Sequence, residues 1–194
     1  HLPIPATART WATSWIRNSP NPKLAILDPG RGLNSSHWDA TNFAKLSCHL
    51  RSAYQYRSII CWRTELERNF AHRIVEQSRN SASLAPHADL QHLAALLELS
   101  DLFVSGDIEP LHVSVALGTP TINLHAKTTD RNCGTYRQLT LQSGDDDETS
   151  NKNSTRKPRS GVNRQKLTSH ALSFERVCDA VSEIESKQRL LRAS

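Results

Sequence analysis

The chain has 194 residues, of which 37% are hydrophobic, and its 24 basic and 19 acidic side chains give a formal net charge of +5. This length suits one ordinary domain, and no apolar run approaches the ~18 residues of a membrane-spanning helix. Globular chains are usually about 45–50% apolar with glycine counted, so part of this sequence should lie outside any hydrophobic core. The chain begins with His1 and contains no methionine, so we expect a fragment or a trimmed product.

Strand and helix patterns alternate along the chain. Residues 23–28 form a short apolar run that ends in Pro29-Gly30, which is typical of a strand running into a turn. The spacing of apolar residues predicts strands at 23–28, 56–62, 101–105 and 121–125, and helices at 39–50, 65–77, 86–99, 110–117 and 173–190. Strands and helices that alternate at this spacing imply a parallel sheet with right-handed crossovers. The prediction is a Rossmann-like α/β domain over residues 23–142, with helices on both faces of its sheet.

A polar stretch precedes the last predicted helix. An acidic run at 145–148 is followed by the basic cluster 156–159, and Val162 is the one aliphatic residue over 145–166. Such a composition cannot bury enough apolar surface to offset its ordering entropy. We therefore expect a disordered insert at 143–168, followed by a C-terminal helix at 169–194 that packs on the domain.

Ligands of open parallel sheets bind beyond the carboxyl ends of the strands, in loops that lead into helices. Three such loops are expected, at 28–32, 61–65 and 105–112. The last turns directly into a helix N-terminus, where free N–H groups and the helix dipole favour an anion such as a phosphate. Pro110 fits near the start of that helix, and a protonated His112 in its first turn could donate to a phosphate oxygen. From these residues alone, both roles stay open, and a histidine in such a position is more often structural than ligand-binding.

Residues 102–121, LFVSGDIEPLHVSVALGTPT, resemble the signature of glycosyltransferase family 9, the heptosyltransferases. The family pattern is roughly [LV]-x-V-x-x-D-T-G-P-x-H-x-A-x-A-L-G-T-P. Asp28-Pro29-Gly30, His37-Trp38, Glu65 and the helix at 90–97 are similar to other family segments. The likeness covers residues 23–137 and 171–190 in order, and it skips the polar insert.

The resemblance implies a GT-B enzyme, built from two facing Rossmann-like domains, that transfers a heptose-like sugar from an ADP-sugar to a lipopolysaccharide-type acceptor. This chain would be the C-terminal, donor-binding domain, with residues 1–22 as the interdomain connection. The catalytic base and the glycolipid acceptor site would lie in an N-terminal domain, so we expect no catalytic residue here. The resemblance implies no cofactor, no metal and no nucleic acid. It implies a cytoplasmic protein with at most peripheral contact to the inner face of the inner membrane.

By position, the resemblance implies a set of donor-binding residues: Asp107, Pro110, His112, Glu65, Gly30, His37 and Trp38. Two departures from the family pattern bear on this site. Ile108-Glu109 stands where the family has Thr-Gly, which places a carboxylate beside the expected pyrophosphate. His37 stands where the family has lysine, and it is a weaker cation at neutral pH. The alternative is therefore a diverged, non-catalytic α/β interaction module without a bound donor.

Other function classes fit less well. Nucleic-acid binding is disfavoured because the basic cluster at 156–159 has no interleaved aromatic residues and adjoins an acidic run. The sequence has no G-x-S-x-G motif for a serine hydrolase. The histidines lack the i, i+4 pairing of a helical metal site. The four cysteines are far apart and match no zinc or redox spacing, so we expect free thiols.

Overall fold

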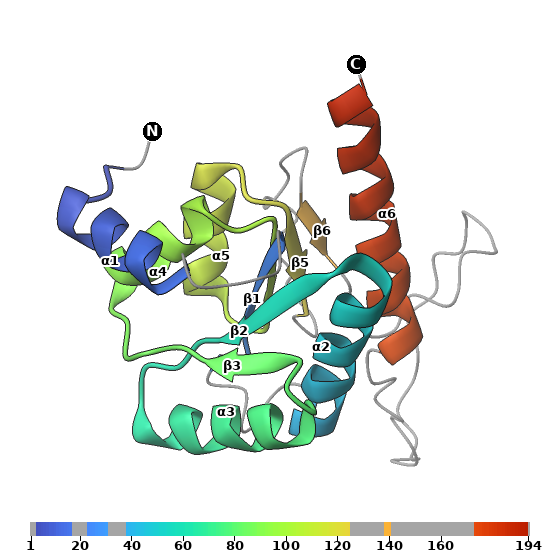
Figure 1. Ribbon diagram of the computed structural model, residues 1–194, viewed down its shortest axis with the longest axis horizontal. Helices are drawn as coiled ribbons and strands as arrows, with labels where there is room; N and C mark the ends of the chain where they lie inside the picture. The colour runs from blue at the N-terminus through green and yellow to red at the C-terminus, as the bar shows by residue number, and fades with distance from the viewer. Residues whose placement is uncertain (1–2, 17–22, 31–37, 125–137, 141–172, 194) are drawn as a thin grey trace, which may run out of the picture.

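The computed structural model describes residues 3–16, 23–30, 38–124, 138–140 and 173–193. These residues form a six-stranded sheet in the order β3-β2-β1-β4-β5-β6, and every neighbouring pair of strands is parallel (Figure 1). The strands are β1 (Lys23–Asp28), β2 (Tyr56–Ile60), β3 (Ala82–Leu84), β4 (Leu102–Ser105), β5 (Thr121–Asn123) and β6 (Gln138–Thr140). The helices are α1 (Ala6–Ile16), α2 (Ala40–Tyr54), α3 (Glu65–Gln77), α4 (Leu90–Glu98), α5 (Ile108–Leu117) and α6 (Phe174–Ala193). The predicted Rossmann-like fold is confirmed.

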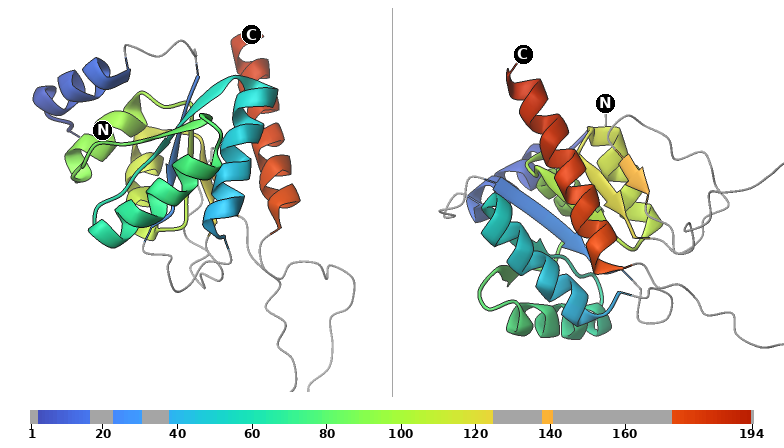
Figure 2. Two further views of the ribbon diagram at one scale, coloured as in Figure 1. Left: turned by 60° about the horizontal axis from the view of Figure 1, so that its bottom comes forward. Right: turned by 90° about the vertical axis from the view of Figure 1, so that its right-hand side faces the viewer.

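The sheet is covered on both faces, as Figure 2 shows. On one face α2, α3 and α6 enclose a hydrophobic core, and on the other α1, α4 and α5 enclose a second one. Successive side chains of β1 point to opposite faces of the sheet, so this strand contributes to both cores. Ala25 and Leu27 lie in the first core, and Leu24 and Ile26 lie in the second. A parallel sheet buried on both faces accounts for the continuous apolar run in this strand.

Three elements were not predicted from the sequence: α1, β3 and β6. The two strands have three residues each, too few to show a periodicity. Helix α1 packs against α4 and lies within residues 1–22, whose assignment as an interdomain connection stays a prediction. The predicted insert at 143–168 lies outside the described residues. Among the described helices, none combines the length and apolar character of a membrane-spanning segment.

Side-chain caps start four of the described helices. Each cap accepts a hydrogen bond from the backbone N–H three residues on, as N-cap residues do, and the caps are Asp39, Thr64, Asp89 and Ser173. Helix α5 differs, because Asp107 at its N-cap makes no such bond. This helix begins at Ile108, two residues earlier than predicted.

Candidate functional site

The candidate site lies where the carboxyl ends of three adjacent strands meet. The chain crosses from β1 to β2 on one side and from β4 to β5 on the other, so the strand order reverses direction between β1 and β4. Open parallel sheets bind their ligands at this switch point. Asp28 ends β1, Arg63 follows β2, and Asp107 follows β4.

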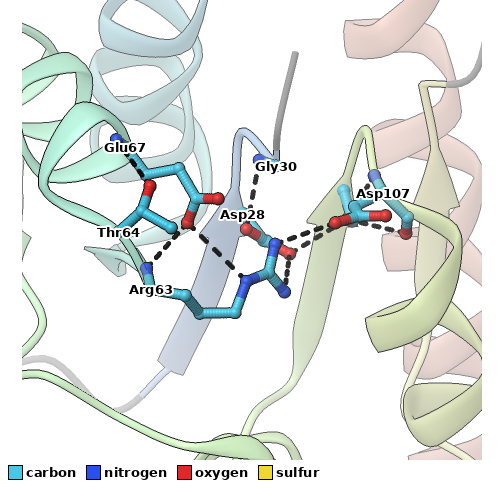
Figure 3. A network of polar contacts seen from close by, with 7 residues as sticks. Asp28, Gly30, Arg63, Thr64, Glu67 and Asp107 are labelled. Atoms are coloured by element: carbon cyan, nitrogen blue, oxygen red, sulfur yellow. Dashed lines mark hydrogen bonds and ion pairs between the residues drawn. The ribbon is translucent and has the colours of Figure 1, made fainter. Parts of the chain in front are cut away.

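A single guanidinium joins these three strand ends (Figure 3). The Nη2 of Arg63 donates to Oδ2 of Asp107 at 2.9 Å, and its Nη1 lies 3.5 Å from Oδ2 of Asp28. Its Nε lies 3.6 Å from Oε2 of Glu67 on α3, and the Arg63 backbone N–H donates to the same oxygen at 2.7 Å. We call Asp28, Arg63, Glu67 and Asp107 the Arg63 cluster. It ties α3 to the loops after β1, β2 and β4.

Asp28 is the most buried member of the Arg63 cluster. Burial raises the pKa of its carboxyl group from 3.8 to about 6, against the opposing effects of Arg63 and of a hydrogen bond from the Gly30 backbone. That backbone N–H donates to Oδ1 at 3.1 Å, and the hydroxyl of Ser105 donates to Oδ2 at 3.3 Å. Two hydrogen bonds and the ion pair with Arg63 therefore stabilise the ionised form of Asp28, but burial away from water destabilises it more.

The loops after β1 and β4 approach each other closely. Gly30 has a φ of 67°, and a Cβ built on it would lie 2.8 Å from the Cβ of Asp107. The Asp107 backbone N–H donates to Oγ of Ser105 at 2.9 Å, and that hydroxyl lies 3.2 Å from the Asp107 carbonyl oxygen. Glycine is required at position 30 both for its positive φ and for this close approach.

The structure brings several of the predicted site residues to this switch point. Asp107 belongs to the Arg63 cluster, and Gly30 contacts its loop. Pro110 is buried in the first turn of α5. His112 is exposed, and the earlier start of α5 places it in the second turn, so the expected first-turn position is wrong. Glu109 is exposed in the first turn and makes no ion pair among the described residues.

The other predicted residues lie elsewhere. Glu65, the first residue of α3, has a side chain 73% exposed and pairs with Arg68 at 3.4 Å. Trp38 is 2% exposed and packs against Phe43 and Phe174, so its ring belongs to the hydrophobic core. A ring with so little exposed surface has almost none to offer a ligand. His37 lies outside the described residues.

Sequence reasoning missed three members of the Arg63 cluster: Asp28, Arg63 and Glu67. The loop at 61–65 was recognised as facing the ligand edge, but Glu65 was chosen from it. The sequence did contain a signal for this cluster, since it has a basic residue after one strand and acidic residues at the ends of two others. These residues meet only if the three strands are parallel neighbours. Arg63 could therefore be identified only once the strand order β2-β1-β4 was known.

The remaining polar chemistry is limited. Within the described ranges, no group of three or more histidine, cysteine, aspartate or glutamate side chains could hold a metal ion. Cys48, Cys61 and Cys178 are free thiols, and Cys133 lies outside the described residues. Burial raises the pKa of the Cys61 thiol, which makes this cysteine a poor nucleophile.

Comparison with known proteins adds the family. The family model of glycosyltransferase family 9 (heptosyltransferase) matches residues 6–162. The chain belongs to glycosyltransferase family 9. No curated protein sequence matches it significantly. Family membership favours a glycosyltransferase over a non-catalytic interaction module.

Solved structures of family 9 enzymes share the fold. A Veillonella parvula family 9 glycosyltransferase superposes with a TM-score of 0.63 at 21% identity, over 74% of this chain and 42% of that one. Escherichia coli ADP-heptose lps heptosyltransferase II superposes with a TM-score of 0.67 at 13% sequence identity, over 97% of this chain and 54% of that one. Escherichia coli heptosyltransferase WaaC with ADP-2-deoxy-2-fluoro heptose superposes with a TM-score of 0.55 at 20% sequence identity, over 68% of this chain and 41% of that one. The chain thus spans about half the length of these GT-B enzymes, or less.

Proposed function

We propose that this chain is the C-terminal, donor-binding domain of a family 9 glycosyltransferase. It binds a nucleotide-sugar, an ADP-heptose or a close analogue, for transfer to a lipopolysaccharide-type acceptor. The observation that carries the proposal is the N-terminus of α5, which has no side-chain cap and lies at the switch point of the parallel sheet, beside the Arg63 cluster. The family match and the ADP ligands named for the related WaaC structures support this donor class.

The donor's diphosphate would lie at the first turn of α5. The backbone N–H groups of that turn have no partners within the helix, and Asp107 does not cap them. Helix dipoles favour negative charge at this end, although Glu109 also places a carboxylate there. We propose that Glu65 accepts hydrogen bonds from the ribose hydroxyls and that His112 lies near the phosphates. Trp38 would support the site from the core, through its packing on α2.

In this proposal the chain binds and orients the donor, and its contribution to catalysis is to stabilise the departing nucleotide diphosphate. Negative charge develops on the diphosphate as the bond to the sugar breaks, and backbone N–H groups aimed at it stabilise that charge. The base that activates the acceptor hydroxyl belongs to a partner domain that also holds the glycolipid. We propose that the reaction needs no metal or organic cofactor and takes place on the cytoplasmic side of the inner membrane.

Thermal unfolding with ADP tests the proposal. A ligand at ten times its Kd stabilises the folded state by about 1.4 kcal/mol, which raises the Tm of a domain this size by roughly 3–6 °C. We expect that shift for the natural sequence and a larger one in Glu109→Gln, which removes the exposed carboxylate from the first turn of α5. The matched control is Asp89→Ala, which removes the N-cap of α4 and should lower the Tm while leaving the ADP shift intact. No shift of the natural sequence at millimolar ADP or ADP-sugar would contradict donor binding.

A further inference from the structure

The Arg63 cluster carries more negative than positive charge. One guanidinium faces three carboxylates, which gives a net charge of −2 when all four groups are ionised. Two of these carboxylates, on Asp28 and Glu67, have side chains only 2% and 6% exposed, so water screens them poorly. Without Arg63 the same volume would hold three uncompensated negative charges.

Arg63 also determines where the Asp107 carboxylate lies. Hydrogen bonds with the Ser105 hydroxyl fix the backbone of Asp107. Its carboxylate has two possible partners, Arg63 and the backbone N–H groups in the first turn of α5, which an N-cap aspartate normally bonds. Here Oδ2 instead accepts from Nη2 of Arg63 at 2.9 Å, and no cap bond forms. Asp39 and Asp89, which pair with no arginine in the part of the chain that the structure describes, both cap their helices.

We propose that Arg63 is a positioning residue of the donor site, which holds the Asp107 carboxylate away from the first turn of α5 and offsets the negative charge that an anionic ligand meets there. This inference rests on the proposed function. Figure 3 shows the guanidinium beside Asp28, with Asp107 on one side of it and Glu67 on the other. Each of its three nitrogens is within 3.6 Å of a carboxylate oxygen. Arg63 therefore acts through these carboxylates and not as the diphosphate's own cation.

Two ligands separate this role from a merely structural one. ADP and adenosine share the nucleoside, and only ADP carries the diphosphate. We expect Arg63→Gln to weaken ADP binding about tenfold at about pH 7.5 and adenosine binding less than about twofold, measured by calorimetry on the 194-residue chain. Arg63→Lys keeps the positive charge and should recover part of the ADP affinity. Arg9→Gln is the matched control, because Arg9 makes a two-bond pair with Glu98 on the outer helices α1 and α4.

The pH dependence gives a second readout. Asp28 faces Arg63 and Cys61 after β2, Glu67 on α3 and Asp107 before α5. Losing Arg63 removes the positive charge that favours the ionised form of Asp28, so the pKa of this carboxyl group should rise above its value of about 6 in the natural sequence. Near pH 6.5 Asp28 should then be largely protonated in the variant and still largely ionised in the natural sequence, which removes one negative charge from the variant alone. The ADP deficit of Arg63→Gln relative to the natural sequence should therefore be smaller near pH 6.5 than near pH 7.5.

The outcomes are distinct. A selective loss of ADP affinity that the lysine variant and a pH near 6.5 partly restore supports the inference. Equal weakening of ADP and adenosine, or unchanged ADP binding, overturns it while leaving the proposed function standing. If Arg63→Gln does not fold, the same comparison of ligands and pH is made with Arg63→Lys, where unchanged relative affinities at both pH values overturn the inference. Failure of the natural sequence to bind ADP overturns the proposed function, and the inference falls with it.

Discussion

Asp28→Asn should stabilise the folded chain at neutral pH, even though it removes a charge from an ion pair. Burial raises the pKa of Asp28 from 3.8 to about 6, and each pKa unit corresponds to 1.36 kcal/mol. Ionising this carboxyl group in the folded state therefore costs roughly 3 kcal/mol near pH 7. Asparagine keeps an acceptor for the Gly30 N–H, but its amide would face Arg63, so we expect a net gain of about 1–2 kcal/mol.

The pH dependence fixes the sign of this effect. Since the folded-state pKa of Asp28 lies above the unfolded value, the folded chain binds more protons between about pH 4 and pH 6. The contribution of Asp28 to stability is present in acid and is lost as the pH rises through 6, whereas asparagine does not titrate. The advantage of the variant should thus grow between about pH 4 and pH 6, be complete above pH 6 and be absent below about pH 4.

Urea unfolding at about pH 4.5 and pH 7.5 measures the effect as a difference in the free energy of unfolding. Asp89→Asn is the control, because Asp89 is exposed, its pKa is lowered by hydrogen bonds from His92, and asparagine caps a helix equally well. This control should show no gain at neutral pH. A loss of more than about 1 kcal/mol in Asp28→Asn at pH 7.5 would mean that the ion pair with Arg63 outweighs the cost of burying the Asp28 charge, contrary to the expected gain.

Two further substitutions test the geometry of the fold. Gly30→Ala should destabilise the chain by about 1–3 kcal/mol in urea unfolding, because its Cβ would meet the Cβ of Asp107 at 2.8 Å and φ is 67°; an unchanged midpoint would contradict the close approach of these loops. Tyr56→Phe should cost about 1.5–3 kcal/mol, because the buried hydroxyl donates to the buried Glu185 carboxylate at 2.6 Å. Its control, Tyr54→Phe, loses only an exposed bond and should change stability by less than about 0.5 kcal/mol; equal effects of the two would contradict the burial of this bond.

The fold was predictable where the sequence repeats a period over many residues. The apolar stripes of α2, α3 and α4, and the apolar runs of β1, β2 and β4, correspond to predicted segments within a few residues. Short strands could not be found in this way, since β3 and β6 owe their conformation to pairing with β2 and β5. Local sequence also placed the start of α5 two residues late, because Pro110 was taken as its first residue and occupies its third.

The site was predictable only in part, because sequence places residues on loops and tertiary structure decides which loops meet. Asp107 and Gly30 were found through the family motif, and the structure brings their loops into contact. Arg63 was missed because its importance comes from neighbours 35 or more positions away, on other strands. Trp38 was chosen because it matches a family motif, but its side chain packs in the hydrophobic core. A match to a motif therefore does not by itself place a residue in the site.

A crystal structure of this chain with ADP bound tests the central proposal most directly. We expect the diphosphate at the first turn of α5, beside the Arg63 cluster at the carboxyl ends of β1 and β4, with the ribose toward Glu65. We also expect the pairing of Arg63 with Asp107 at 2.9 Å to be kept in the complex. A nucleotide bound elsewhere on the domain would contradict donor binding at this site, and phosphates that displace Asp107 from Arg63 would contradict the positioning role of Arg63.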